Sequence, residues 1–295
     1  MANSVAIDEK TGRKYFLDQP DDYRPGEKVT FILNLHGGGS VGQWQHAYFP
    51  AHDYADKYRL VVATPSSLTK EPIRRWVGEA DDEHLKNICE SVFAKYGKQN
   101  IKAFWLVGHS QGGMTSNRLL RTPYFNDRVD GWMSLSGGRI GPAEHSAHFR
   151  PPPRPGQENS MPPANLIQRP PDTLHDGDFS HIFTTGEHEI VALPETSPWA
   201  AKYGAGARKR LPDVVDTEPG RIWDTTREGN SSKGWGYKPA PGTAEVYVYP
   251  GARDGRVIAD VVRLNKGHTE GFEPKVLDKL LELLVQEPGG KLQKV

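Results

Sequence analysis

Short apolar runs alternate along the chain with stretches in which apolar residues recur every three or four positions. The runs are rich in Val, Ile, Leu, Phe and Trp and are bounded by turn-forming residues, as is typical of buried strands. They lie at residues 29–35, 60–63, 101–107, 129–136 and 181–185. Helical spacing follows two of them, at residues 81–96 and 111–120. This alternation predicts an α/β protein with a mostly parallel sheet flanked by helices.

The two ends of the chain show a different pattern. Residues 4–7 and 14–17 surround a polar turn and predict an opening hairpin. Residues 245–249 and 257–264 alternate like strands with only a turn between them, so we expect an antiparallel hairpin or an addition to the sheet edge. A last amphipathic helix begins near Pro274.

The run at 101–107 leads into the sequence GHSQG, residues 108–112. This is the pattern G-x-S-x-G, in which a serine occupies a sharp turn between a strand and a helix. Gly108 and Gly112 flank Ser110, because a side chain at either position would collide with neighbouring backbone. Since the motif here follows a predicted strand and opens a predicted helix, Ser110 is the candidate nucleophile. His109 occupies the variable position before it.

A second glycine-rich segment, HGGGS at residues 36–40, directly follows the strand at 29–35. Glycines just past a buried strand leave backbone N–H groups exposed, and these groups can donate to a developing oxyanion. The alternative is an ordinary flexible turn. Because this segment and Ser110 would share one edge of the sheet, we favour the oxyanion role, with His36 supporting the loop.

Among eleven histidines, His268 differs by its position. It lies in a small-residue loop between the last predicted strand and the final helix, where it can act as the base that deprotonates a serine. The acid of such a triad comes between the serine and the histidine along the chain. The strand at 181–185 is followed by a turn and two candidates, Glu187 and Glu189, whereas Asp254 lies in the turn of the late hairpin.

Residues between the chemical segments have simpler interpretations. Trp76 stands in a loop that leads toward the active edge, where it either lines a substrate pocket or fills the core. Asp81 or Asp82 is expected to cap the following helix, which Gly97 ends. Cys89 falls on the apolar face of that helix, so we interpret it as a core residue rather than a reactive thiol.

Two long segments interrupt the alternation. Residues 150–171 contain eight prolines and predict an irregular, partly extended segment. Residues 197–242 are irregular and carry Trp223 and Trp235. Since strands resume after each segment, we expect one domain over residues 1–295, with insertions at about 139–180 and 197–242 that act as lid or substrate-pocket segments.

The amino-acid composition limits the kinds of binding partner that we expect. Thirty-seven basic residues balance 37 acidic ones, so no global field attracts nucleic acid or an anionic membrane. No apolar run reaches the length of a membrane span, and the opening residues MANSVAIDEKTGRK lack the apolar segment of a signal peptide. We therefore expect a soluble protein, cytoplasmic as the chain stands and secreted if a signal was removed. The single cysteine excludes an intrachain disulfide and a cysteine metal cluster.

The order of five segments, HGGGS, RRWVGEADD, GHSQGG, GEHEIV and GHTEG, resembles the polyhydroxybutyrate depolymerase and feruloyl esterase group of α/β-hydrolases. The resemblance covers residues 29–138, 181–191 and 257 onward. It implies an eight-stranded, mostly parallel sheet and cleavage of carboxylic esters by a serine, acid and histidine triad. It also implies oxyanion donors at the N–H of Gln111 and at that of Gly38 or Gly39.

The same resemblance selects the triad acid. In this group the acid comes three residues after the glycine that follows the strand, which is Glu189 here. The group usually has aspartate there, so glutamate is a departure. Trp76 and His109 are then candidates for substrate binding.

The function predicted from these residues is two-step acyl transfer to water, without a metal or organic cofactor. The substrates would be small, aromatic or polyester-type esters. Amide or peptide hydrolysis and acyl transfer to an alcohol use the same triad and remain alternatives. A non-catalytic binding module with this fold is a third, for which loss of a triad member would be the signature.

Overall fold

The computed structural model describes residues 4–71, 73–142, 172–174, 176–189, 194–227 and 234–295. The strands of its main sheet are β1 (Val5–Ile7), β2 (Lys14–Asp18), β3 (Val29–Leu35), β4 (Leu60–Pro65), β5 (Ile101–His109), β6 (Gly131–Leu135), β9 (Ser180–Gly186), β10 (Lys209–Arg210), β11 (Val214–Val215), β12 (Thr243–Val248) and β13 (Ile258–Arg263). Two further short strands, β7 (Gly141–Pro142) and β8 (Asp172–Thr173), pair with each other. The helices are α1 (Gly42–Tyr48), α2 (Ala55–Tyr58), α3 (Ala80–Tyr96), α4 (Gln111–Leu120), α5 (Pro123–Asn126), α6 (Pro198–Lys202) and α7 (Pro274–Leu284), with short 3-10 turns such as η1 (Ala51–Tyr54) and η7 (Arg253–Gly255).

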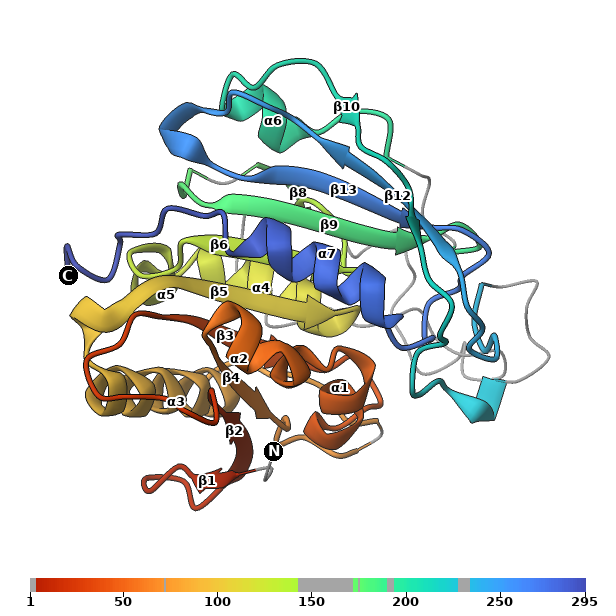
Figure 1. Ribbon diagram of the computed structural model, residues 1–295. Coiled ribbons are helices and arrows are strands. Elements are labelled where there is room, and N and C mark those ends of the chain that lie inside the picture. The colour runs from red at the N-terminus through yellow and green to blue at the C-terminus, as the bar shows by residue number, and fades with distance from the viewer. Residues whose placement is uncertain (1–3, 72, 143–171, 175, 190–193, 228–233) are drawn as a thin grey trace, which may run out of the picture.

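The main sheet has the strand order β1-β2-β4-β3-β5-β6-β9-β13-β12-β10, and β11 pairs with β12 (Figure 1). The six strands from β4 to β13 in this order run parallel. β1 and β2 form the predicted opening hairpin, and β12 lies antiparallel beside β13, as the sequence also predicted. The sheet is mostly parallel, as predicted, but among the described residues it has eleven strands rather than the expected eight. Strands β12, β10 and β11 extend it beyond β13.

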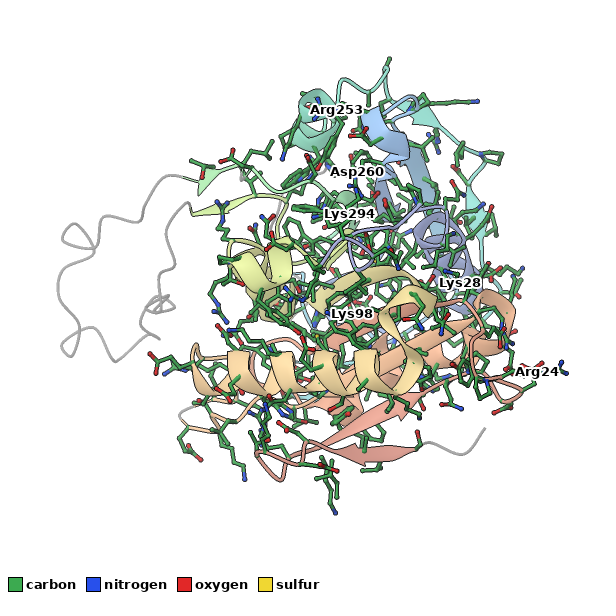
Figure 2. The ribbon with its side chains drawn as sticks, turned by 90° about the vertical axis from the view of Figure 1, so that its left-hand side faces the viewer. Arg24, Lys28, Lys98, Arg253, Asp260 and Lys294 are labelled. Atoms are coloured by element: carbon green, nitrogen blue, oxygen red, sulfur yellow. The ribbon has the colours of Figure 1, made fainter. Side chains whose placement is uncertain are left out.

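Both faces of the sheet are covered, as the continuous apolar strands predict. Along β3, Phe31 and Leu33 contact the core cluster that includes α3 and the end of α4, whereas Ile32 belongs to the cluster that includes α1 and α7. Successive strand side chains point to opposite faces, so one strand supplies both layers. Figure 2 shows the side chains that fill the space between α3 and the strands behind it.

Local sequence signals explain most helix and strand boundaries, but the predicted N-cap of α3 is wrong. Helix α3 ends at Gly97, whose φ of 81° favours glycine. Its N-cap is Glu79, so neither Asp81 nor Asp82 caps it. The buried Asp81 carboxylate instead accepts the N–H groups of Leu68 and Val77, because the loop before the helix folds back over its first turn. Cys89 is fully buried in the core, as predicted, and burial raises the pKa of its thiol.

The structure describes a larger part of the second insertion than of the first. The proline-rich residues 150–171 lie outside the described residues. The second insertion contains α6, β10 and β11 between irregular segments, and its last part reaches the loop that carries His268. Among the described residues, no helix combines the length and the apolar character needed to cross a membrane.

Candidate active site

The turn between β5 and α4 holds Ser110 in a strained conformation. Its φ of 51° and ψ of −116° lie outside the regions that residues other than glycine usually adopt. A Cβ on Gly108 would lie 2.3 Å from the carbonyl carbon of Gly112, and one on Gly112 would lie 2.3 Å from the Leu35 oxygen. Only glycine permits this close approach of β3, β5 and α4. The strain therefore presents Ser110 at the carboxyl edge of the sheet and at the start of α4.

Glu189 and His268 form a direct pair at the same edge. Oε2 of Glu189 lies 2.7 Å from Nδ1 of His268. Oε1 of Glu189 accepts the hydroxyl of Ser136 at 2.6 Å and the N–H of Gly186 at 2.7 Å. Because a carboxylate only accepts, the proton of the shared bond lies on Nδ1. Nε2 of His268 is buried and has no hydrogen-bond partner among the described residues, so its lone pair is free to take a proton.

Glu187 occupies a different position. Its Oε2 accepts the backbone N–H of Asn265 at 2.8 Å, and the side chain is exposed. This contact fastens the loop after β9 to the loop after β13, which the backbone bond from His188 N–H to the Lys266 oxygen also does. Of the two acids that the sequence offered, the one that contacts His268 is therefore Glu189. Asp254 lies in the exposed η7 turn, with a φ of 60°.

The loop of His268 is held on three sides. Its backbone N–H donates to the Gly234 oxygen at 2.8 Å, and its backbone oxygen lies 2.8 Å from Nε2 of His109. The ring of Trp235 packs 4.1 Å from the imidazole, measured between ring centroids. His109 is the residue before Ser110, so this hydrogen bond joins the turn that carries Ser110 to the loop that carries His268.

The glycine-rich segment after β3 lies against the start of α4. A Cβ on Gly37 would lie 3.3 Å from Cβ of Ser110, and one on Gly38 would lie 3.6 Å from Oε1 of Gln111. Gln111 begins α4, where backbone N–H groups have no acceptor within the helix. The N–H groups of Gly38 and Gln111 donate to no acceptor among the described residues. Both groups are therefore available to stabilise a developing oxyanion.

Gly39, the other glycine that the resemblance implied, has its N–H engaged. That group donates to the Arg74 oxygen at 2.7 Å. The bond fixes the loop against the segment that carries Trp76, and it removes Gly39 from the free donors. Of the two glycines, only Gly38 has a backbone N–H without an acceptor among the described residues.

His36 supports this loop, as expected. Its ring is fully buried; Nδ1 donates to the Gly37 oxygen at 2.7 Å, and Nε2 accepts the N–H of Ser67 at 2.9 Å. These two partners fix a neutral tautomer. Burial lowers the pKa of His36 to about 4, which keeps the ring neutral at pH 7.

We expect this buried ring to make stability depend on pH. The unfolded chain takes up a proton near pH 6.5, whereas folded His36 does so near 4, so stability falls as the pH drops through that window. The shift corresponds to about 3 kcal/mol at most. His36→Gln should lower stability at neutral pH and flatten this dependence. Urea denaturation at several pH values checks it, with exposed His188→Gln as control, and an unchanged pH dependence in His36→Gln would contradict the prediction.

Trp76 and His109, the two candidates for substrate binding, have buried side chains that contact the loops of the site. Trp76 is 6% exposed, and its indole N–H donates to the His36 oxygen at 2.8 Å. His109 is 4% exposed, and its ring packs against Tyr48 as well as His268. Burial and the neighbouring His268 lower the pKa of His109 well below its usual range. Both side chains therefore act on the backbone of the loops and leave little surface for a ligand.

Two contacts of the site were not assigned from the sequence. Ser136 follows β6 with a φ of 58° and donates to Glu189, although the sequence shows only a serine before a glycine pair. Trp235 was noted in the second insertion, but its contact with His268 spans 33 residues of chain. A serine at the carboxyl end of a parallel strand is the one local signal that could have indicated Ser136.

We compared the chain with protein-family models, curated proteins and solved structures. A scan of protein-family models finds no match for the chain, and no curated protein matches its sequence. The solved acetyl xylan esterase from Aspergillus awamori is similar at a TM-score of 0.55 and 12% identity, over 96% of this chain and 100% of that one. The native thermophilic esterase Est2 from Thermogutta terrifontis gives 0.47 at 14% identity, over 97% and 90%.

At such low identities a structural likeness bears on the fold alone. The resemblance to the depolymerase and feruloyl esterase group therefore stays a prediction. The parallel sheet, its covering helices and the first of these likenesses agree with one another. The chain has the α/β-hydrolase fold.

Proposed function

We propose that this protein is a carboxylic ester hydrolase in which Ser110, His268 and Glu189 form the catalytic triad. The observation that carries the proposal is the hydrogen bond from His268 Nδ1 to Glu189, which leaves His268 Nε2 without a hydrogen-bond partner among the described residues. The imidazole lies next to the ring of His109, the residue before Ser110. A buried imidazole with a fixed tautomer and a free Nε2 is the arrangement that a serine nucleophile needs.

The reaction would proceed in two steps. Nε2 of His268 takes the hydroxyl proton as Oγ of Ser110 bonds to the ester carbonyl carbon, and the N–H groups of Gln111 and Gly38 stabilise the oxyanion. The carbon–oxygen bond to the alcohol then breaks, and His268 returns the proton to that oxygen. Water attacks the acyl-enzyme by the same route and releases the acid and Ser110.

Glu189 would hold His268 in the Nδ1–H tautomer and stabilise the imidazolium that forms in each step. Its carboxylate is suited to this because three donors fix it: His268, Ser136 and Gly186. Trp235 and His109 would keep the imidazole in place from two sides. The chemistry needs no metal ion or organic cofactor.

For the substrate we propose several classes of ester rather than one compound. Small, aromatic and polyester-type esters follow from the resemblance, and the structurally similar acetyl xylan esterase adds acetylated carbohydrate. We propose that residues 1–295 form one domain whose second insertion, through Trp235, borders the substrate. Amide hydrolysis and acyl transfer remain the rival reactions, since both use the same triad.

A substrate panel tests the proposal. We expect turnover of p-nitrophenyl esters of graded chain length, a feruloyl ester, acetylated xylan or a polyester film, and loss of that turnover in the Ser110→Ala variant. Matched anilides and added alcohols would separate hydrolysis of amides and acyl transfer. Faster turnover of an anilide than of its ester would favour the rival reaction, and no turnover of any ester that depends on Ser110 would overturn the proposal.

A further inference from the structure

A second cluster of polar side chains, which shares no residue with the site around Ser110, lies between β2 and the α1–η1 segment. Asp18 ends β2, His46 lies in α1 and His52 in η1, and each is less than 10% exposed. One ligand atom from each of the three lies within 4.8 Å of the others. We propose that these residues bind one divalent transition-metal ion, with Zn²⁺ as the best fit, as a structural clamp.

The contacts inside the cluster favour a metal over a simple ion pair. Nε2 of His46 lies 2.9 Å from Oδ2 of Asp18, and the rings of His46 and His52 are stacked with centroids 3.6 Å apart. Nε2 of His52 lies 3.4 Å from Oδ1 of Asp53, while its Nδ1 is buried without a hydrogen-bond partner among the described residues. Metal-bound histidines commonly have this combination, with a carboxylate at one nitrogen and the other nitrogen free for the ion.

The donor set selects the metal. Two imidazole nitrogens and one carboxylate oxygen suit Zn²⁺, which binds such ligands at about 2.0–2.2 Å in a tetrahedron and takes water as its fourth ligand. In that tetrahedron neighbouring donors are about 3.4 Å apart. The 4.8 Å limit on the cluster is therefore within reach of small side-chain rotations. Ca²⁺ and Mg²⁺ prefer sets made of oxygen alone.

The ligands come from elements that the ion would join. Asp18 belongs to the second strand of the sheet, whereas His46 and His52 lie on the segment that covers β3 and β4. In the same helix as His46, Tyr48 packs its ring 4.2 Å from His109, and its backbone oxygen accepts the N–H of Phe272. Metal binding would thus fix a segment that supports both the serine turn and the loop after His268.

Calorimetry on the full chain tests the site. After treatment with a chelator and its removal, we expect ZnCl₂ to bind with one site per chain and micromolar or tighter affinity. At 100 times the dissociation constant, the melting temperature should rise by about 5 °C. Co²⁺ in place of Zn²⁺ should give the intense visible absorption of a four-coordinate ion.

Variants locate the ion. Asp18→Asn and His52→Gln should each weaken Zn²⁺ binding at least tenfold. His84→Gln is the matched control, because His84 is also buried and pairs with an aspartate, Asp8, at 2.7 Å but does not belong to such a cluster within the described residues. Unchanged affinity in the first two variants, or no binding below millimolar Zn²⁺, would overturn the proposal. If those variants failed to fold, a six-coordinate Co²⁺ spectrum of the unmodified chain would overturn it equally.

Discussion

Ser110→Ala should lower kcat on the best ester by on the order of 10⁶ and leave the fold unchanged, as removal of a triad nucleophile does. The expectation rests on the turn itself. The strain at Ser110, with φ of 51°, is maintained by close backbone contacts of Gly108 and Gly112 rather than by the hydroxyl. Alanine can adopt the same backbone at similar cost, so the loss should be chemical and the melting temperature nearly unchanged.

A covalent probe makes this prediction independent of the natural substrate. A fluorophosphonate should label the unmodified chain at Ser110, as mass spectrometry of the modified peptide would show, and the alanine variant should not react. Ser116→Ala is the matched control, because Ser116 lies in the same helix and donates to the Gly112 oxygen. It should keep both labelling and turnover. An alanine variant at position 110 with a tenth of the original turnover would remove Ser110 from the mechanism.

The elements that fold by local rules were predictable from the sequence. β3 and α4 have the predicted boundaries, and Gly97 ends α3, because apolar periodicity and glycine signals act within a few residues. The side of the sheet on which the site lies followed from the same logic. Parallel strands bring their carboxyl ends to one edge, so Ser110 and His268 were expected together although 158 residues separate them.

The contacts that decide between similar residues were not predictable. The sequence left Gly38 and Gly39 equivalent, and the choice depends on a bond from Gly39 to Arg74, which is 35 residues away. The sequence does not decide whether Trp76 lines a substrate pocket or fills the core. In the structure its indole N–H donates to the backbone oxygen of His36, which lies 40 residues earlier in the chain. Such pairings depend on how loops settle over the sheet, and no local pattern encodes them.

The metal cluster illustrates the same point outside the active site. Asp18, His46 and His52 have no motif spacing, and the sequence predicted no metal. They meet because β2 adds to the sheet antiparallel to β4, which places the end of β2 beside the segment that covers β4. Topology alone therefore creates a site that pattern reasoning along the chain does not reveal.

Glu189→Gln should lower kcat by roughly 10²–10⁴ with little change in melting temperature, whereas Glu187→Gln should change kcat little. The two substitutions are matched in chemistry and lie in one loop. They differ in partner, since Glu189 holds His268 and Glu187 holds the N–H of Asn265. Steady-state kinetics on one ester decides the matter. A large loss only in the Glu187 variant would move the acid to that residue.

The size of the expected loss follows from the neighbours of Oε1. Ser136 and Gly186 both donate to that oxygen, so the glutamine would keep its carbonyl there and turn its NH₂ toward His268. Because an amide NH₂ only donates, Nδ1 would have to accept, and the imidazole proton would move to Nε2. His268 could then no longer take the proton of Ser110, although its position would hardly change. The substitution should therefore lower kcat and leave KM nearly unchanged. A rise in KM as large as the fall in kcat would instead indicate that the loop of His268 had moved.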